Sequence, residues 1–153
     1  YYLASKSNQL GHNPEIILAG RKINDQIPMH IANKINSLIN GNINNAKTLI
    51  LGASFKENCP DFRNSKVIDL ANELINLGHT IDIFDPLVDK EEFFKEYKYK
   101  LIEEPGEGYD SIILAVAHTE FQKINLNKLK RNSESIIYDI KGFLPRNLIT
   151  SRL

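Results

Sequence analysis

The sequence predicts an α/β fold in which a long helix precedes a parallel sheet with helices on both faces. Two observations support this. Apolar residues recur at helical spacing up to about residue 40, and from residue 47 onward short apolar runs alternate with helical segments. Strands separated by helical segments indicate a parallel sheet whose connecting helices cover both of its faces. We therefore expect a doubly wound, Rossmann-like domain over residues 46–153, attached to a helical segment over residues 1–41.

The first segment contains no strand-like alternation. A short helical stretch ends near Gly11, and Asn13-Pro14 forms a start signal, with Asn13 as the cap and Pro14 as the first helical residue. The apolar positions that follow recur at spacings of three and four, which indicates one amphipathic helix. Pro28 should kink it, because proline removes a backbone donor. We expect the helix to end at Gly41, before a polar linker over 42–45.

Strands and helices then alternate along the rest of the chain. The next helix should be capped by Asn64 or Ser65 and end at Gly78. Another is expected from about Lys90 to Tyr97, and a short one after Phe121. Strands are predicted at 47–52, 80–84, near 101, at 111–116 and, as the last of the series, at 135–139.

Composition excludes several classes of protein. The 153 residues include 19 basic and 19 acidic side chains, so the formal net charge is zero and neither nucleic acid nor a membrane surface is an expected partner. No run approaches the roughly 18 apolar residues of a membrane span. The single cysteine, Cys59, precludes an internal disulfide and fits a reducing compartment, the cytoplasm. No second histidine, cysteine or aspartate repeats at metal-ligand spacing, so no metal site is expected. Because the chain opens on Tyr1, we expect an upstream part to be missing.

The loop after the first predicted strand carries the clearest chemical signal. It lacks Gly-x-Gly-x-x-Gly and is too long for a dinucleotide loop, so no conventional NAD site is expected here. Lys56 and Arg63, with Asn64 and Ser65 at a helix start, could instead form an anion site suited to a diphosphate. The alternative is a solvated loop whose cations pair with the neighbouring acidic residues, Glu57 and Asp61. On physical grounds the two interpretations are equally supported.

The same loop resembles a known family signature. The pattern Gly52-x-x-Phe55-Lys56-x-x-x-x-Asp61-x-Arg63-x-Ser65 is similar to that of the third domain of the UDP-glucose/GDP-mannose dehydrogenase family. Its variant residues resemble the subgroup that oxidises UDP-N-acetylhexosamines for surface polysaccharides, the Vi-antigen type. Further motifs agree in order along essentially the whole chain: Tyr1-Tyr2-Leu3-Ala4-x-Lys6, Ile17 to Asp25, Asp85-Pro86, Ala115 to His118, and Asp139-x-Lys141-Gly142.

This resemblance implies a division of labour in a longer enzyme. A preceding domain would bind NAD, the long helix would build a homodimer, and the last domain would bind the UDP part of a UDP-sugar. The sugar C6 alcohol would be oxidised to a carboxylate through a cysteine a few residues before Tyr1, so Cys59 is not the nucleophile and this chain alone should be inactive. The alternative is a stand-alone degenerate Rossmann module that binds a nucleotide or dimerises without redox activity.

The resemblance also assigns individual residues. Lys56 should contact the nucleotide or diphosphate. The other substrate-binding residues would be Arg63, Arg21 and Asn24 on the long helix, and Lys141 after the last strand. Structural roles in the loop or in turns are expected for Phe55, Asp61 and Asp85. None of these residues is expected to be catalytic.

Overall fold

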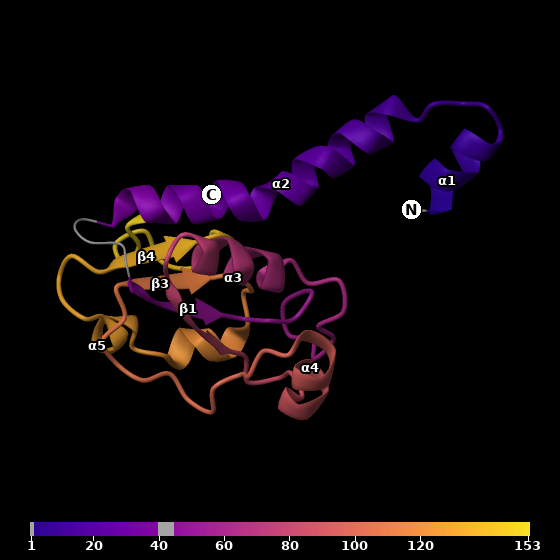
Figure 1. Cartoon of the computed structure of the whole chain (residues 1–153). Helices are drawn as coiled ribbons and strands as arrows, with labels where there is room; N and C mark the ends of the chain where they lie inside the picture. The colour runs from indigo at the N-terminus through magenta and orange to yellow at the C-terminus, as the bar shows by residue number, and fades with distance from the viewer. Residues whose placement is uncertain (1, 40–44) are drawn as a thin grey trace.

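The computed structural model describes residues 2–39 and 45–153, and shows a parallel sheet preceded by a long helix (Figure 1). The predicted helix end at Gly41, most of the predicted linker and Tyr1 lie outside the described residues. The sheet has the strand order β2-β1-β3-β4-β5, and every neighbouring pair is parallel. Its strands are β1 (Lys47–Leu51), β2 (Thr80–Phe84), β3 (Ser111–Leu114), β4 (Ile136–Asp139) and β5 (Ser151–Arg152). The predicted α/β fold is thus confirmed.

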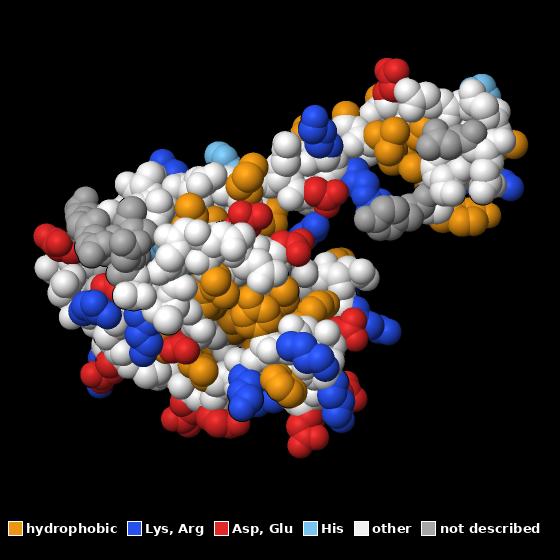
Figure 2. Space-filling view, in the orientation of Figure 1, with side chains coloured by type: hydrophobic (Ala, Val, Ile, Leu, Met, Phe, Trp, Pro, Cys, Tyr) orange, Lys and Arg blue, Asp and Glu red, His pale blue; other side chains and the backbone are white. Residues whose placement is uncertain are grey.

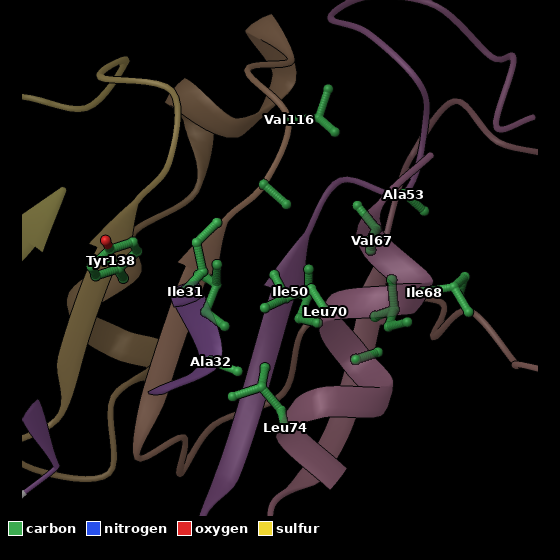
Figure 3. Packing of buried hydrophobic residues seen from close by; sticks show 14 of the residues in the cluster. Ile31, Ala32, Ile50, Ala53, Val67, Ile68, Leu70, Leu74, Val116 and Tyr138 are labelled. Carbon is green, nitrogen blue, oxygen red and sulfur yellow. The ribbon is translucent and has the colours of Figure 1, made fainter. Parts of the chain in front are cut away.

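Helices cover both faces of this sheet. On one face lie α2 (Glu15–Leu38) and α3 (Val67–Asn76), and on the other lie the 3-10 helix η1 (Thr119–Lys123) and α5 (Leu126–Leu129). Two further helices are α1 (Tyr2–Gln9) and α4 (Lys90–Tyr97). Figure 3 shows how α2 enters the core: Ile31 and Ala32, both buried, face the sheet and α3 near Ile50, Leu70 and Leu74. Alternate residues of β1, β3 and β4 supply the cores on the two faces, because strand side chains point to opposite faces.

The two halves of the long helix α2 differ in how they pack. Its second half is buried on the domain through Pro28, Ile31, Ala32 and Ile35, whereas its first half projects beyond the sheet with α1 at its end (Figure 1). The helix bends near its middle in Figure 1, and Pro28 lies inside it, in agreement with the predicted kink. The packed half therefore anchors a helical arm.

Several predicted boundaries were wrong in detail. The series does not end at residue 139, because β5 adds a fifth parallel strand through two residue pairs with β4. The strand expected near Leu101 is a single bridge to Ile83. The long helix begins at Glu15, with Pro14 at the cap position and no side-chain cap bond. Short elements of this kind depend on tertiary pairing and carry little sequence periodicity of their own.

The strand order creates one point where the chain winds in opposite directions. β1 lies between β2 and β3, so the connections leaving β1 and β2 run to opposite sides of it. In open parallel sheets, ligands bind outside the carboxyl ends of the strands at such a point. Here the segments that follow β1 and β3 are in close contact: a Cβ on Gly52, whose φ is +97°, would lie 2.5 Å from the Cβ of Val116.

Candidate functional site

A cleft lies at this carboxyl edge, between α2 and the domain. Its volume is about 840 Å³. The walls come from the inner face of α2, the β1–α3 loop, the start of α3, and the residues after β3 and β4. The polar side chains in these walls are Arg21, Asn24, Asp25, Ser54, Asn64, Ser65, Lys66, Asp69 and Lys141. An apolar floor with convergent polar groups is the usual form of a small-molecule site.

The substrate-binding residues predicted from the sequence fall into three places. Arg21, Asn24 and Lys141 line the main cleft. Arg63 lines a second, smaller hollow of about 240 Å³ together with Phe55, Asp61 and Asn64. Lys56 lines neither hollow. Its side chain is exposed on the β1–α3 loop, which contributes residues to both. Phe55 and Asn64 border both hollows, so the two are adjacent.

Ion pairs join the two walls of the cleft. Lys66 at the start of α3 lies 2.9 Å from Asp25 on α2 and 3.1 Å from Asp69. Its hydrogen bonds to Asp25 and then Asp69 raise the pKa of Lys66, so the ammonium stays charged. Arg21 also contacts Asp25, at 3.8 Å. Neither Lys66 nor Asp25 was expected from the sequence, because nothing in their local pattern shows that α2 lies against α3.

Lys141 is placed by a buried aspartate at the end of β4. The Oδ1 of Asp139 accepts the Lys141 N–H at 3.0 Å, and its Oδ2 accepts the Leu144 N–H at 2.8 Å. Asp139 is fully buried. The turn that follows includes Gly142 at a positive φ of 67°. The Asp139-x-Lys141-Gly142 motif therefore forms a fixed turn that holds an exposed lysine at the cleft.

Asp61 and Arg63 form a compact exposed pair. The Arg63 guanidinium donates to both carboxylate oxygens, Nε to Oδ1 at 2.9 Å and Nη2 to Oδ2 at 2.7 Å, and the Arg63 N–H also donates to Oδ1. The backbone of Asp61 accepts the Phe55 N–H at 2.7 Å, which closes the loop. Lys56 forms no ion pair with any described residue. The interpretation in which both cations are neutralised by neighbours therefore holds for Arg63 but not for Lys56.

The contact with Arg63 should be visible in the titration of the Asp61 carboxyl group. Hydrogen bonds from the Arg63 side chain and backbone lower the pKa of Asp61 from 3.8 to about 2. Because the folded pKa is depressed, any stability the pair contributes is present above pH 3.8 and lost as the pH falls through about 2. In an NMR titration, Arg63→Gln should return the Asp61 midpoint toward 3.8, and Arg146→Gln, at another exposed arginine, should not. An unchanged midpoint in Arg63→Gln would contradict the assignment.

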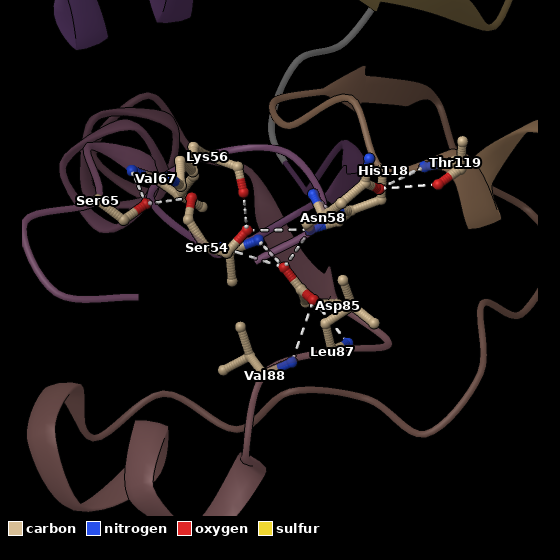
Figure 4. Close-up of polar contacts among 11 residues, drawn as sticks. Ser54, Lys56, Asn58, Ser65, Val67, Asp85, Leu87, Val88, His118 and Thr119 are labelled. Carbon is tan, nitrogen blue, oxygen red and sulfur yellow. Dashed lines mark hydrogen bonds and ion pairs between the residues drawn. The ribbon is translucent and has the colours of Figure 1, made fainter. Parts of the chain in front are cut away.

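Asp85, directly after β2, binds the start of the β1–α3 loop. Its Oδ2 accepts the N–H groups of Ala53 and Ser54 at 2.7 and 3.1 Å, and its Oδ1 accepts those of Leu87 and Val88 (Figure 4). Burial raises the pKa of Asp85, but the hydrogen bonds from His118, Ala53 and Leu87 outweigh this and lower it overall. Asp85 thus supports the turn expected from its place beside Pro86, and it also ties β2 to the β1–α3 loop.

The described residues contain neither a metal centre nor a membrane helix. Within 2–39 and 45–153, no three His, Cys, Asp or Glu side chains are grouped so that they could hold a metal ion. Nor does this part of the chain include a helix long and apolar enough to cross a membrane.

Comparison with known proteins matches most of the sheet domain to a known family. Residues 49–146 match the UDP-glucose/GDP-mannose dehydrogenase family, UDP binding domain. The UDP-N-acetyl-D-glucosamine 6-dehydrogenases of Pseudomonas aeruginosa and Salmonella typhi are 38% and 40% identical over 100% of this chain. Staphylococcus aureus Protein CapL is 37% identical over 94% of it. The chain spans 38%, 37% and 35% of these three relatives.

A solved structure shows the same fold over nearly the whole chain. The GDP-mannose dehydrogenase of Pseudomonas aeruginosa superposes with a TM-score of 0.76 and 22% sequence identity. The likeness covers 99% of this chain and 36% of that one. The long helix and the sheet that follows it are therefore a shared architecture.

Proposed function

Because the chain belongs to the UDP-glucose/GDP-mannose dehydrogenase family, whose UDP binding domain residues 49–146 form, we propose that it supplies UDP-sugar recognition to an NAD-dependent UDP-N-acetylhexosamine 6-dehydrogenase. The observation that carries this proposal is the cleft at the carboxyl edge of β1, β3 and β4. It offers Arg21 and Lys141 to an anion, and the adjoining β1–α3 loop carries Lys56, which forms no ion pair within residues 2–39 and 45–153. A diphosphate matches this chemistry, since it concentrates negative charge over a few oxygens.

We propose that the complete enzyme oxidises the sugar C6 alcohol to a carboxylate. The change removes two hydrides, so it consumes two NAD molecules, and water supplies the second carboxylate oxygen. In this scheme residues 46–153 bind the UDP part, residues 1–41 link domains and dimerise, and the hydride chemistry belongs to the NAD domain. The single cysteine of this chain is compatible with a reducing, cytoplasmic setting. The product class suits surface polysaccharide synthesis.

Within the site, we propose that Lys56 and Arg63 contact the nucleotide side of the ligand and that Arg21, Asn24 and Lys141 contact it from the cleft. The positions of the last three support this, because all line one hollow although Lys141 is far in sequence from Arg21 and Asn24. Arg63 donates two side-chain hydrogen bonds to Asp61. It would bind the ligand either while keeping this pair or by exchanging it for bonds to the ligand. Asp61, Phe55 and Asp85 shape the loop.

Calorimetry on this chain tests the proposal. We expect saturable heat with UDP, no measurable binding of NAD, and no dehydrogenase activity, because the loop after β1 lacks the glycine pattern that lets a backbone approach a dinucleotide. Saturable NAD binding by the chain would contradict the division of labour. Heat with neither ligand would favour the alternative, a dimerisation module without a nucleotide site.

The helical arm supports the proposed homodimer. Its exposed apolar side chains include Ile16, 90% exposed, and Ile23, 63% exposed, with Tyr2 and Leu3 on α1 and Leu10 directly after it. Figure 2 shows hydrophobic side chains at the surface of this arm. A self-complementary surface of this kind is most often covered by a symmetric pair.

Sedimentation should therefore find a dimer at high micromolar concentration. The double variant Ile16→Glu/Ile23→Glu should sediment as a monomer, because four glutamates would be brought into one apolar contact. Ile75→Glu removes an exposed apolar residue on α3, outside the arm, and should leave the dimer intact. A wild-type monomer would contradict the proposal.

A further inference from the structure

His118 is a buried histidine that the proposed function has not yet used. It follows β3 at the carboxyl edge of the sheet and has no exposed surface. Its Nδ1 lies 2.9 Å from the Asn58 backbone nitrogen. Its Nε2 lies 3.0 Å from Asp85 Oδ2 and 3.0 Å from Ser54 Oγ (Figure 4). One imidazole thus joins the β1–α3 loop to the residues after β2 and β3.

The hydrogen-bond partners of His118 determine which of its two ring nitrogens carries the proton. A backbone N–H can only donate, so Nδ1 of His118 must accept the bond from Asn58 and carry no proton. Nε2 therefore carries the proton and donates it to the Asp85 carboxylate. The Ser54 hydroxyl lies 3.0 Å from the Lys56 carbonyl and donates to it. A serine and an aspartate that share one ring nitrogen do not form a nucleophilic triad, in which they would flank opposite nitrogens.

Asn58 fastens the far side of the same loop. Its backbone is left-handed, with a φ of 55°, a conformation that asparagine tolerates better than most residues. Its Oδ1 accepts the Thr119 N–H at 3.0 Å and the Thr119 hydroxyl at 2.8 Å. Together with His118, these contacts fix the loop at Ser54 and at Asn58. Lys56 lies midway between, exposed and without an ion-pair partner among the described residues.

We propose that His118 and Asn58 are positioning residues for Lys56, holding the 54–58 backbone so that the lysine ammonium is presented to the diphosphate of the UDP-sugar. The inference rests on the proposed UDP site. Its physical basis is preorganisation, since a loop already ordered before binding does not lose that freedom when the ligand arrives. Losing one hydrogen-bonded contact that holds this loop should weaken binding roughly threefold to tenfold.

The test uses the full-length enzyme, UDP-N-acetylglucosamine and NAD. His118→Ala should raise KM for the UDP-sugar about tenfold and leave KM for NAD unchanged. His118→Asn should recover part of the loss, because its Oδ1 can accept the Asn58 N–H. Asn58→Gly is a milder variant: glycine adopts the left-handed conformation and keeps the N–H donor but removes both Thr119 contacts. Should His118→Ala fail to fold, Asn58→Gly carries the test, with an expected threefold rise.

Coupling to Lys56 separates positioning from general stability. Once Lys56→Ala is present, His118→Ala or Asn58→Gly should add little to KM, because there is no ammonium left to position. Leu126→Ala, a buried residue of the opposite core, should lower Tm but leave both KM values unchanged. Additive effects, or a normal KM in folded His118 and Asn58 variants, would overturn the positioning role alone. If Lys56→Ala by itself has no effect, the UDP site is wrong and the positioning role is wrong with it.

Discussion

Replacing Lys56 with alanine in the full-length enzyme is expected to raise KM for the UDP-sugar about tenfold to a hundredfold and to spare KM for NAD. A charge-assisted contact between an ammonium and a diphosphate typically contributes about 1.5–3 kcal/mol. Tm should hardly change, because the Lys56 side chain is exposed and forms no ion pair with a described residue. Steady-state kinetics and thermal unfolding of the same preparation measure both quantities.

Lys128→Ala is the matched control for this experiment. Lys128 is an exposed lysine on α5, which lies at the other end of the sheet from the loop after β1 (Figure 1). The two variants remove the same charge, so a general electrostatic effect would change KM for the UDP-sugar equally in Lys56→Ala and in Lys128→Ala. A normal KM for UDP-sugar in Lys56→Ala would mean that the loop after β1 is not the nucleotide site.

Gly52→Ala is expected to be the most destabilising single-methyl change in the sheet edge, by about 2–6 kcal/mol. Two independent costs add: an L residue at a φ of +97° is strained by about 1–3 kcal/mol, and overpacking costs a similar amount. The new Cβ would meet the Val116 Cβ at 2.5 Å and the Val116 nitrogen at 2.9 Å. That nitrogen cannot easily move away, since it is hydrogen-bonded to the Leu51 carbonyl.

Gly20→Ala gives the opposite expectation and serves as the control. Gly20 lies within α2, and a Cβ there would meet nothing within 4 Å. Alanine should therefore stabilise the helix, by up to about 1 kcal/mol. Chemical denaturation of the two variants measures the difference directly. If Gly52→Ala unfolds at the wild-type denaturant concentration, the close contact between the ends of β1 and β3 does not exist in solution.

The family relationship and the geometry support different parts of this account. Identity of 38–40% to two UDP-N-acetyl-D-glucosamine 6-dehydrogenases over the whole chain supports the proposed reaction class. The geometry supports the proposed roles of particular residues, because it brings Arg21 and Lys141 to one cleft and gives Lys56 no ion-pair partner among the described residues. A different substrate would leave the cleft in place, whereas a normal KM in Lys56→Ala would place the nucleotide elsewhere in the same chain without changing its family.

The sequence alone determined the fold class, and it singled out the loop after β1 as the proposed nucleotide loop. Apolar spacing separates a helix from a strand because each element buries one face, so α2 and the strands β1 to β4 were recognisable from local patterns. Long-range pairing decided the rest. β5 has two residues and exists only because β4 offers it an open edge. The His118–Asn58–Asp85 network joins three loops that are adjacent only because the strand order brings the ends of β1, β2 and β3 together. No local pattern records such a contact, since its partners lie 33 to 60 positions apart in the chain.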